Sequence, residues 1–213
     1  MSISCWYCDV QSLSDPALFS RCMSLLPWEE RRKQVMRFRF EKDRRLCLGA
    51  GLLLAYALRY AGASNLSLRR LPNGKPALDA CPDIHFNLSH SGTLAVCAVS
   101  DQPVGVDVEI LQSAVPGVEA ICFQPREREW IHRSDDPGRA FTRLWTRKES
   151  YLKLLGSGIL CSLDSFCVLP EKDIQNNRIV FSETERMNCL ICVCTRQKDK
   201  DMVVFKRWRI QLP

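Results

Sequence analysis

The order of the apolar segments along the chain limits its possible folds more than any other feature. A β-like run at 3–10 is followed by helical patterns and then by two β-branched runs, and a similar order returns after residue 103. Single strands that alternate with single helices would indicate a doubly wound parallel sheet, which this order does not match. We therefore expect an α+β fold with two halves that meet near residue 103.

Capping residues and periodicity place the expected elements. Asp136-Pro137, for example, combines a capping side chain with proline in the first turn, and Gly156 stands where that helix ends. The turn residues 101–103 predict a hairpin between the apolar runs 94–99 and 104–110. The sequence further predicts helices at 28–38, 43–62 and 136–155, shorter helices from about 14 and 125, and strands at 3–10, 84–88, 165–169, 178–182, 189–195 and 202–210.

The composition indicates a folded protein. The chain has 213 residues, of which 46% are hydrophobic and 25% charged, so disordered and fibrous classes are excluded. The longest apolar stretch, 46–58, ends at Arg59 and is shorter than the roughly 20 residues that cross a bilayer. The first ten residues lack the basic and long apolar regions of a secretory signal. We expect a cytoplasmic protein that does not bind membranes.

Twelve cysteines are many for a chain of this length. Without a secretory signal, reduced thiols are expected. Two Cys-x-x-Cys pairs, one at Cys5 and Cys8 and one at Cys189 and Cys192, leave zinc open as an alternative. Both pairs lie in β-like runs, where residues three apart point to opposite faces. We therefore expect these cysteines to be small buried hydrophobic residues.

The chain carries an excess of positive charge. Lys and Arg number 30 and Asp and Glu number 24, a formal net charge of +6. The window 31–45 holds eight basic and two acidic residues, so this window alone has a net charge of +6. A solvated helix face explains such a window, and a phosphate-rich ligand is the alternative. A basic RNA-binding protein is a further alternative, although no recognisable RNA-binding motif is present.

Two acidic residues share one face of an otherwise apolar run. In a strand at 104–110, Asp107 and Glu109 would point the same way, about 7 Å apart along the chain. Their repulsion is costly unless a cation offsets it, and Mg²⁺ binds one or two carboxylates together with phosphate oxygens. An exposed edge strand with two solvated acids is the other interpretation.

Charged residues interrupt the apolar stripe of the helix at 136–155. Phe141 and Leu152 belong to this stripe, and Lys148 falls on it as well. Glu149 lies beside Lys148, and Lys153 follows Glu149 by four residues. A solvent-exposed pair of Glu149 and Lys153 is one interpretation. The other is that Lys148 and Glu149 face a cleft, one binding phosphate and one serving a metal or acting as a base.

A Ser-His-Ser-Gly loop follows the strand at 84–88. Ser89 and His90 beside a glycine offer several hydrogen-bond donors to a phosphate. A Ser-His hydrolase pair is disfavoured, because adjacent residues of an extended chain point apart and no Gly-x-Ser-x-Gly elbow is present.

Taken together in their order, these motifs resemble the Sfp-type 4′-phosphopantetheinyl transferases over about residues 28–168. The resemblance is carried by Arg45, Asn73-Gly-Lys-Pro76, Phe86-Asn-Leu-Ser-His-Ser-Gly92, Gly105-Val-Asp-Val-Glu109, Phe123-x-x-x-Glu127 and Trp145-x-x-Lys-Glu-Ser-Tyr-x-Lys153. It implies two similar subdomains related by a pseudo-twofold axis, residues 1–102 and 103–213, with coenzyme A in the cleft between them. A non-catalytic coenzyme A-binding relative is the alternative.

The resemblance also implies a reaction and its participants. Such enzymes transfer the phosphopantetheine arm of coenzyme A to a serine of an acyl or peptidyl carrier protein, depend on Mg²⁺, with Mn²⁺ as the alternative, and release adenosine 3′,5′-bisphosphate. The first subdomain would contact the 3′-phosphate and adenine, and the second would supply the metal-binding acids. A monomer that binds no nucleic acid is expected.

Individual roles follow from the matching positions. The resemblance implies Asp107, Glu109 and Glu149 as metal ligands; Glu149, Lys153 and Asp107 as catalytic residues; and Glu149 as the base, with Glu127 or a water on the metal as alternatives. It implies Lys148 and Lys153 at the pyrophosphate and the catalytic helix; Ser89, His90, Arg45 and Arg31 near the 3′-phosphate; and Lys75 and Pro76 beside the adenine. Arg44 is the alternative to Arg45, which is favoured because Gly49 follows it by four residues.

Overall fold

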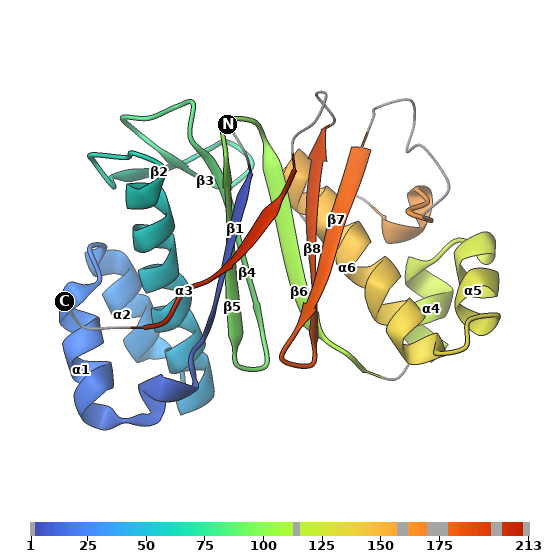
Figure 1. Ribbon diagram of the computed structural model, residues 1–213, viewed down its shortest axis with the longest axis horizontal. Helices are drawn as coiled ribbons and strands as arrows, with labels where there is room; N and C mark the ends of the chain where they lie inside the picture. The colour runs from blue at the N-terminus through green and yellow to red at the C-terminus, as the bar shows by residue number, and fades with distance from the viewer. Residues whose placement is uncertain (1–2, 113–115, 157–161, 170–178, 197–201, 211–213) are drawn as a thin grey trace.

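The computed structural model describes residues 3–112, 116–156, 162–169, 179–196 and 202–210 (Figure 1). Its first half contains β1 (Ser4–Asp9), the 3₁₀ turn η1 (Gln11–Ser14), α1 (Pro16–Leu25), α2 (Glu29–Arg37), α3 (Glu41–Tyr60), β2 (Leu68–Arg70), β3 (Pro76–Leu78), β4 (His85–Ser91) and β5 (Leu94–Ser100). Its second half contains β6 (Val104–Ile110), α4 (Pro116–Cys122), α5 (Pro125–His132), α6 (Pro137–Leu155), the 3₁₀ turn η3 (Leu163–Ser165), β7 (Ile179–Arg186), β8 (Cys189–Arg196) and β9 (Val204–Arg207).

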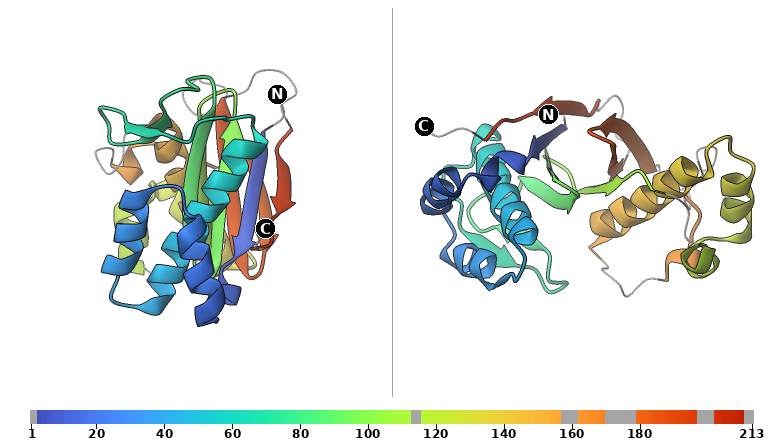
Figure 2. Two further views of the ribbon diagram at one scale, coloured as in Figure 1. Left: turned by 90° about the vertical axis from the view of Figure 1, so that its left-hand side faces the viewer. Right: turned by 90° about the horizontal axis from the view of Figure 1, so that it is seen from below.

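The two halves repeat one topology. In the first, the strand order is β4-β5-β1 and α3 packs against β1 and β5; in the second, the order is β7-β8-β6 and α6 packs against β6 and β8. All of these neighbouring strands are antiparallel. Figure 1 shows the helices of the two halves at opposite ends of the molecule, and the view from below in Figure 2 shows the same separation. The expected α+β class is confirmed.

The expected hairpin between 94–99 and 104–110 is wrong. β5 pairs with β1 and β4, whereas β6 pairs with β8, so the turn at 101–103 carries the chain from one sheet to the other. The sequence could not separate the two outcomes, because strand periodicity shows that each run has an apolar face but not which strand it pairs with. Valines of β6 and alternate residues of β1, β5 and β8 form a core that the two sheets share.

The expected strand at 165–169 is also wrong. The segment begins in the 3₁₀ turn η3 and continues without strand pairing. Phe166 and Val168 are buried in the core around α6, and side chains of α5 and α6 hydrogen-bond to the backbone of this segment. These bonds replace a strand partner, which an apolar run alone cannot reveal.

The last strand returns to the first half. β9 pairs in parallel with β1, with Ser4 opposite Val204, and the Trp208 amide donates to the Tyr7 carbonyl at 2.8 Å. The division of the chain at residues 102 and 103 stays a prediction. β9 comes after this division in the sequence but pairs with β1, which comes before it.

The cysteines behave as buried hydrophobic residues. The eleven in the described ranges are free thiols. Cys5 lies in the core shared by the sheets and Cys8 in the core beneath α3, so the pair points to opposite faces of β1 as expected. No helix in the described part of the chain is long and apolar enough to cross a membrane.

Candidate functional site

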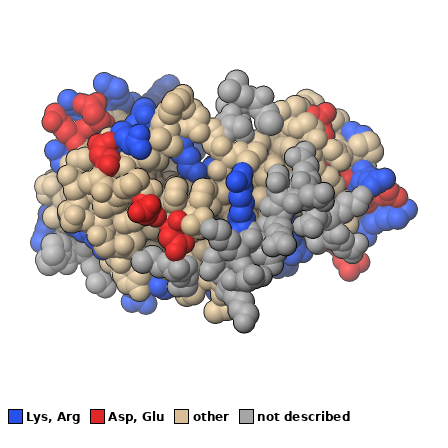
Figure 3. Space-filling view, turned by 90° about the horizontal axis from the view of Figure 1, so that it is seen from above, with Lys and Arg blue, Asp and Glu red and all other residues tan. Residues whose placement is uncertain are grey.

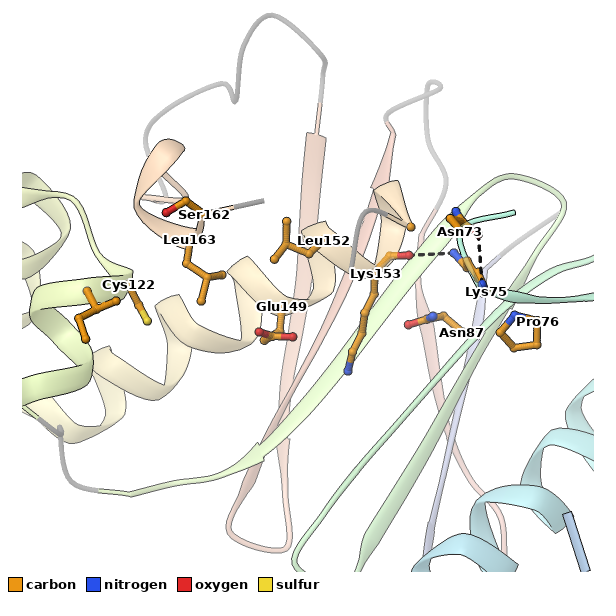
Figure 4. Close-up of a pocket in the computed structure, with 12 residues that line it drawn as sticks. Asn73, Lys75, Pro76, Asn87, Cys122, Glu149, Leu152, Lys153, Ser162 and Leu163 are labelled. Atoms are coloured by element: carbon orange, nitrogen blue, oxygen red, sulfur yellow. Dashed lines mark hydrogen bonds between the residues drawn. The ribbon is translucent and has the colours of Figure 1, made fainter. Parts of the chain in front are cut away.

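A cavity of about 520 Å³ lies between the two halves (Figure 4). One wall belongs to the first half and the other to the second, and α6 lies between them. The lining residues are Asn73, Lys75, Pro76 and Asn87 on the first wall; Ile121, Cys122, Ser162 and Leu163 on the second; and Glu149, Leu152, Lys153 and Gly156 from α6 and its end.

Close packing of α6 on β6 brings residues of the helix to the acidic strand. A Cβ atom added to Gly105 would lie 2.0 Å from the Ser150 carbonyl oxygen and 2.5 Å from the Leu154 nitrogen, so only glycine permits this approach. Asp107 lies on the same face of β6 as Gly105, because alternate strand residues share a face. As a result, Lys153 reaches Asp107.

The Lys153 ammonium joins the two halves of the site. Its Nζ atom lies 2.6 Å from Asp107 Oδ1 and 2.9 Å from Ser89 Oγ, and Ser89 Oγ in turn donates to Asp107 Oδ1 at 2.8 Å. The Asp107 side chain is 4% exposed and the Lys153 side chain 29%. Asp107 Oδ2 is buried and has no hydrogen-bond partner within the described ranges. An unpartnered buried carboxylate oxygen is costly and indicates a missing ligand.

Three carboxylates lie within one electrostatic environment. Burial raises the pKa of Asp107, and the Lys153 ammonium opposes this shift. Burial also raises the pKa of Glu109 and of Glu149, and the charge of Asp107 raises both further. Glu109 accepts a hydrogen bond from Ser91 Oγ at 2.8 Å. The repulsion among these acids is what a divalent cation would relieve.

The three acids fit such a cation in chemistry but are not gathered around one point. No group of three or more His, Cys, Asp or Glu side chains in the described ranges is arranged to hold a metal ion, and the Lys153 ammonium already occupies Asp107 Oδ1. The buried, unpartnered Oδ2 and the two neighbouring carboxylates are the hard oxygen donors that Mg²⁺ prefers. The residues therefore fit Mg²⁺ or Mn²⁺, provided that Lys153 moves away from Asp107.

Cations surround His90, on the β4 side of the site. Burial lowers the pKa of His90, and the charges of Lys153 and Arg31 lower it further, while Asp43 opposes them. Arg31 is held in place by a hydrogen bond from its Nε atom to the Cys47 carbonyl at 3.3 Å. The charges near His90 suit an anionic group. At the opposite end of the molecule, seen from above, individual basic side chains lie near the middle, where the two halves meet (Figure 3).

The structure distinguishes Arg44 from Arg45. Arg44 Nε donates to the Phe38 carbonyl at 2.8 Å, which ties Arg44 to the end of α2. Arg45 is half-buried, and its guanidinium has no hydrogen bond or ion pair with any described residue. Arg45 is therefore the arginine whose donors are available to a ligand.

Lys75 and Pro76 line the cavity, as Figure 4 shows. The Lys75 ammonium donates to the Lys153 carbonyl at 2.8 Å and to the Val104 carbonyl at 3.1 Å. It thereby fastens the loop of the first half to the end of α6. The side chain of Lys75 holds the two walls together, and Pro76 is the neighbouring apolar surface.

Of the expected site residues, Lys75, Pro76, Glu149 and Lys153 line the cavity, and Lys148 and Glu127 are enclosed away from it. Lys148 and Glu127 are both 0% exposed and form an ion pair of 2.8 Å. The Lys148 ammonium also donates to the carbonyls of Leu163 and Phe166, so all three of its hydrogens have acceptors. That Lys148 holds the pyrophosphate stays a prediction; in this structure its ammonium is enclosed by Glu127 and two backbone carbonyls and supports α6. Glu127 is buried with Lys148, and its role as an alternative base stays a prediction as well.

Reasoning from sequence missed the roles of Asn87 and Ser91. With Ser89 they form a polar stripe along β4, and each contacts β6: Asn87 Oδ1 accepts from the Val106 amide at 2.9 Å, and the two serines donate to Asp107 and Glu109. Polar residues at every second position of a strand were a signal that could have identified this stripe.

This arrangement of two repeated halves, with acids and cations at their junction, agrees with what comparisons of the sequence show. One family model, described as 4′-phosphopantetheinyl transferase superfamily, matches residues 103–207, and another, described as 4′-phosphopantetheinyl transferase, N-terminal, matches residues 14–102. The chain belongs to the 4′-phosphopantetheinyl transferase family, as the resemblance predicted.

Curated relatives carry the same description. The chain is 35% identical over 152 residues to a 4′-phosphopantetheinyl transferase of Bacillus subtilis. The aligned residues make up 68% of this chain and 66% of the relative, so the chain spans just under two thirds of the relative's length. It is 32% identical over 159 residues to 4′-phosphopantetheinyl transferase Sfp of Bacillus subtilis strain 168, covering 73% and 71%. It is 37% identical over 134 residues to 4′-phosphopantetheinyl transferase HetI of Nostoc sp., covering 58% and 56%.

Proposed function

We propose that this protein transfers the 4′-phosphopantetheine arm of coenzyme A to a serine of an acyl or peptidyl carrier protein and releases adenosine 3′,5′-bisphosphate. One observation carries the proposal. Lys153 and Glu149 of the second half share a cavity with the β4 side of the first half, next to the buried Asp107 carboxylate that has an unpartnered oxygen. Relatives named 4′-phosphopantetheinyl transferase support it.

The cations near β4 would bind the phosphates of coenzyme A. Arg31 and Lys153 already influence His90, and Arg45 has free donors, so the 3′-phosphate would lie beside these groups and Ser89. Pro76 and the backbone near Lys75 would flank the adenine. Lys153 would exchange Asp107 for the pyrophosphate, because its ammonium is partly exposed and reaches the cavity.

Asp107, Glu109 and Glu149 would hold the divalent cation. When bound, Mg²⁺ or Mn²⁺ neutralises charge on the pyrophosphate during transfer. Burial and the charge of Asp107 raise the pKa values of Glu109 and Glu149, and a cation held by the three carboxylates would offset this repulsion.

The transfer forms one bond and breaks one. The carrier serine oxygen bonds to the β-phosphorus of coenzyme A, and the bond from that phosphorus to the bridging oxygen breaks, so that adenosine 3′,5′-bisphosphate leaves with the electron pair. Glu149, which lines the cavity, would take the serine proton. Its raised pKa makes its carboxylate a stronger base than an exposed glutamate. Lys153 stabilises the charge that builds up on the leaving group.

The carrier itself would be an acidic protein. The net charge of +6 favours association with an acidic surface and speeds the encounter. The expected monomeric state and cytoplasmic location remain predictions, and the free thiols support the second of them.

Mass spectrometry tests the proposal. A carrier domain incubated with the wild-type protein, coenzyme A and Mg²⁺ is expected to gain the mass of one phosphopantetheine group, and the gain is expected to vanish with Asp107→Ala. Glu129→Ala is the control, because Glu129 pairs with Arg133 on α5, is exposed, and lies outside the cavity. Failure to modify any carrier in a panel of fatty-acid, polyketide and peptide types would refute the transferase. Binding of coenzyme A without transfer would instead identify a non-catalytic relative.

A further inference from the structure

The buried pair of Lys148 and Glu127 holds a short stretch of backbone. Lys148 Nζ donates to the Leu163 carbonyl at 2.7 Å and to the Phe166 carbonyl at 2.6 Å. Glu127 Oε1 accepts from the Val168 amide at 2.8 Å, and its Oε2 accepts from the Gln124 amide at 2.9 Å. Two side chains therefore fix three backbone groups of the segment 163–168. Because this segment has no strand partner, the pair takes the place of one.

The same segment forms a wall of the cavity. Leu163 lines the cavity on the side opposite Pro76 (Figure 4). Lys148 immediately precedes Glu149 on α6, and Glu149 lines the cavity as well. The pair thus sets how far the wall stands from Glu149, although neither Lys148 nor Glu127 reaches the cavity itself.

This wall differs in character from the opposite one. On the second-half side, Leu163 lies with Ile121, Cys122 and Leu152. Two lysines line the cavity: Lys75 belongs to the first-half wall, and Lys153 lies on α6 where it meets that wall. An apolar surface without cations does not bind phosphates, but it does bind an uncharged chain. Coenzyme A has both kinds of group: an anionic nucleotide and an uncharged pantetheine arm.

We propose that Lys148 and Glu127 are positioning residues that hold the Leu163 wall against the uncharged pantetheine arm and so align its phosphorus with Glu149. The inference rests on the proposed function, because it takes coenzyme A as the occupant of the cavity. The pair acts through the wall and touches no ligand. It therefore sets the affinity for the arm and leaves the affinity for the nucleotide unaffected.

The variants must separate this role from simple loss of folding. Lys148→Met alone leaves Glu127 as a buried charge without a partner, which strongly destabilises a fold. The double variant Lys148→Met/Glu127→Gln removes both charges and retains an oxygen that can accept from the Val168 amide. Lys148→Arg retains the charge pair. Thermal unfolding establishes that each variant is folded before binding is measured.

Calorimetry with two ligands gives the readout. Coenzyme A contains the arm, and adenosine 3′,5′-bisphosphate does not. For the double variant we expect the affinity for coenzyme A to fall about tenfold, in the range of a misfitted apolar contact, and the affinity for adenosine 3′,5′-bisphosphate to stay unchanged. With Lys148→Arg, the ratio of the two affinities is expected to return toward the wild-type ratio.

A matched variant on the same helix serves as control. Arg139→Met removes a cation that pairs with Glu185 outside the cavity, and both affinities are expected to match those of the wild type. An unchanged ratio in the folded double variant, whether both ligands bind normally or both weaken equally, would overturn the positioning role. Failure of the wild type itself to bind coenzyme A would overturn the proposed function instead, and the inference with it, so the two failures are distinguishable.

Discussion

Two lysines of α6 each pair with a carboxylate of another element, and the pairs differ in how many of their polar atoms have hydrogen-bond partners. Lys148 and Glu127 lie 2.8 Å apart with both side chains 0% exposed, and Lys153 and Asp107 lie 2.6 Å apart at the edge of the cavity. In the first pair, every hydrogen of the ammonium and both carboxylate oxygens have partners. In the second, Asp107 Oδ2 has none among the described residues.

The difference separates structure from function within one helix. A buried polar network in which each group is satisfied stabilises one conformation, whereas an unsatisfied oxygen stores a cost that a ligand can remove. We therefore expect Lys148 to stabilise the second half and Lys153 to take part in its chemistry. Lys148 and Lys153 are five residues apart in the sequence.

The largest effect on stability is expected at the satisfied pair. Glu127→Ala leaves the Lys148 ammonium buried and unpaired and removes the acceptor of the Val168 amide. The free energy of unfolding is expected to fall by about 3–5 kcal/mol, as measured by urea denaturation. A loss below about 1 kcal/mol would show that the buried ion pair and its hydrogen bonds do not stabilise the fold together.

The unsatisfied pair is expected to respond in the opposite way. Asp107→Ala removes a proposed metal ligand but also an unpartnered buried oxygen, and leaves a lysine that is 29% exposed and can reach water. We expect kcat/KM for carrier modification to fall by about 10²–10³-fold or more. The free energy of unfolding is expected to change by no more than about 1 kcal/mol. The assignment would be contradicted if Asp107→Ala lowered the free energy of unfolding by more than this but kept the wild-type kcat/KM per folded molecule.

Moving α6 away from β6 is expected to affect the two pairs unequally. A Cβ atom at Gly105 meets only backbone of α6, so Gly105→Ala should push the helix outward, at a cost of about 1–3 kcal/mol. The separation of Lys153 from Asp107 grows, while Lys148 and Glu127 move together within the second half. Transfer activity is therefore expected to drop in protein that is still folded. Gly117→Ala is the control, because open space surrounds that position.

The smallest effect is expected for a half-exposed arginine on the same helix. The Arg143 side chain is 42% exposed and pairs with Glu183, which is 11% exposed and has a second partner in Arg147. Arg143→Ala is expected to lower the free energy of unfolding by about 0.2–1 kcal/mol and to leave transfer unchanged. A loss comparable to that of Glu127→Ala would mean that burial is not what distinguishes the pairs.

The sequence predicted much of this site for physical reasons. Alternation along β6 placed Asp107 and Glu109 on one face, and the i,i+4 spacing placed Glu149 and Lys153 on one side of α6. Lys148 falls on the apolar stripe, a signal of burial, but we interpreted this position as facing a cleft. Its partner Glu127 lies 21 residues away on another helix, and no local pattern reveals such a pairing.

The errors have a common origin. Apolar runs such as 94–99 and 166–168 fix burial but not the choice of hydrogen-bond partner, because that choice depends on groups distant in sequence. The same holds for Lys153, whose contact with Ser89 joins residues 64 positions apart.

The parallel pairing of β9 with β1 has a consequence for synthesis of the chain on the ribosome. The strand that completes the first sheet is formed by Val204–Arg207, so β1 presents an open edge while some 190 residues of the chain are being translated. A nascent chain that has released only its first hundred residues lacks this cover. Its exposed strand edge then needs protection from pairing with other chains, which makes this stage the one at which expression of the protein is most sensitive to chaperones.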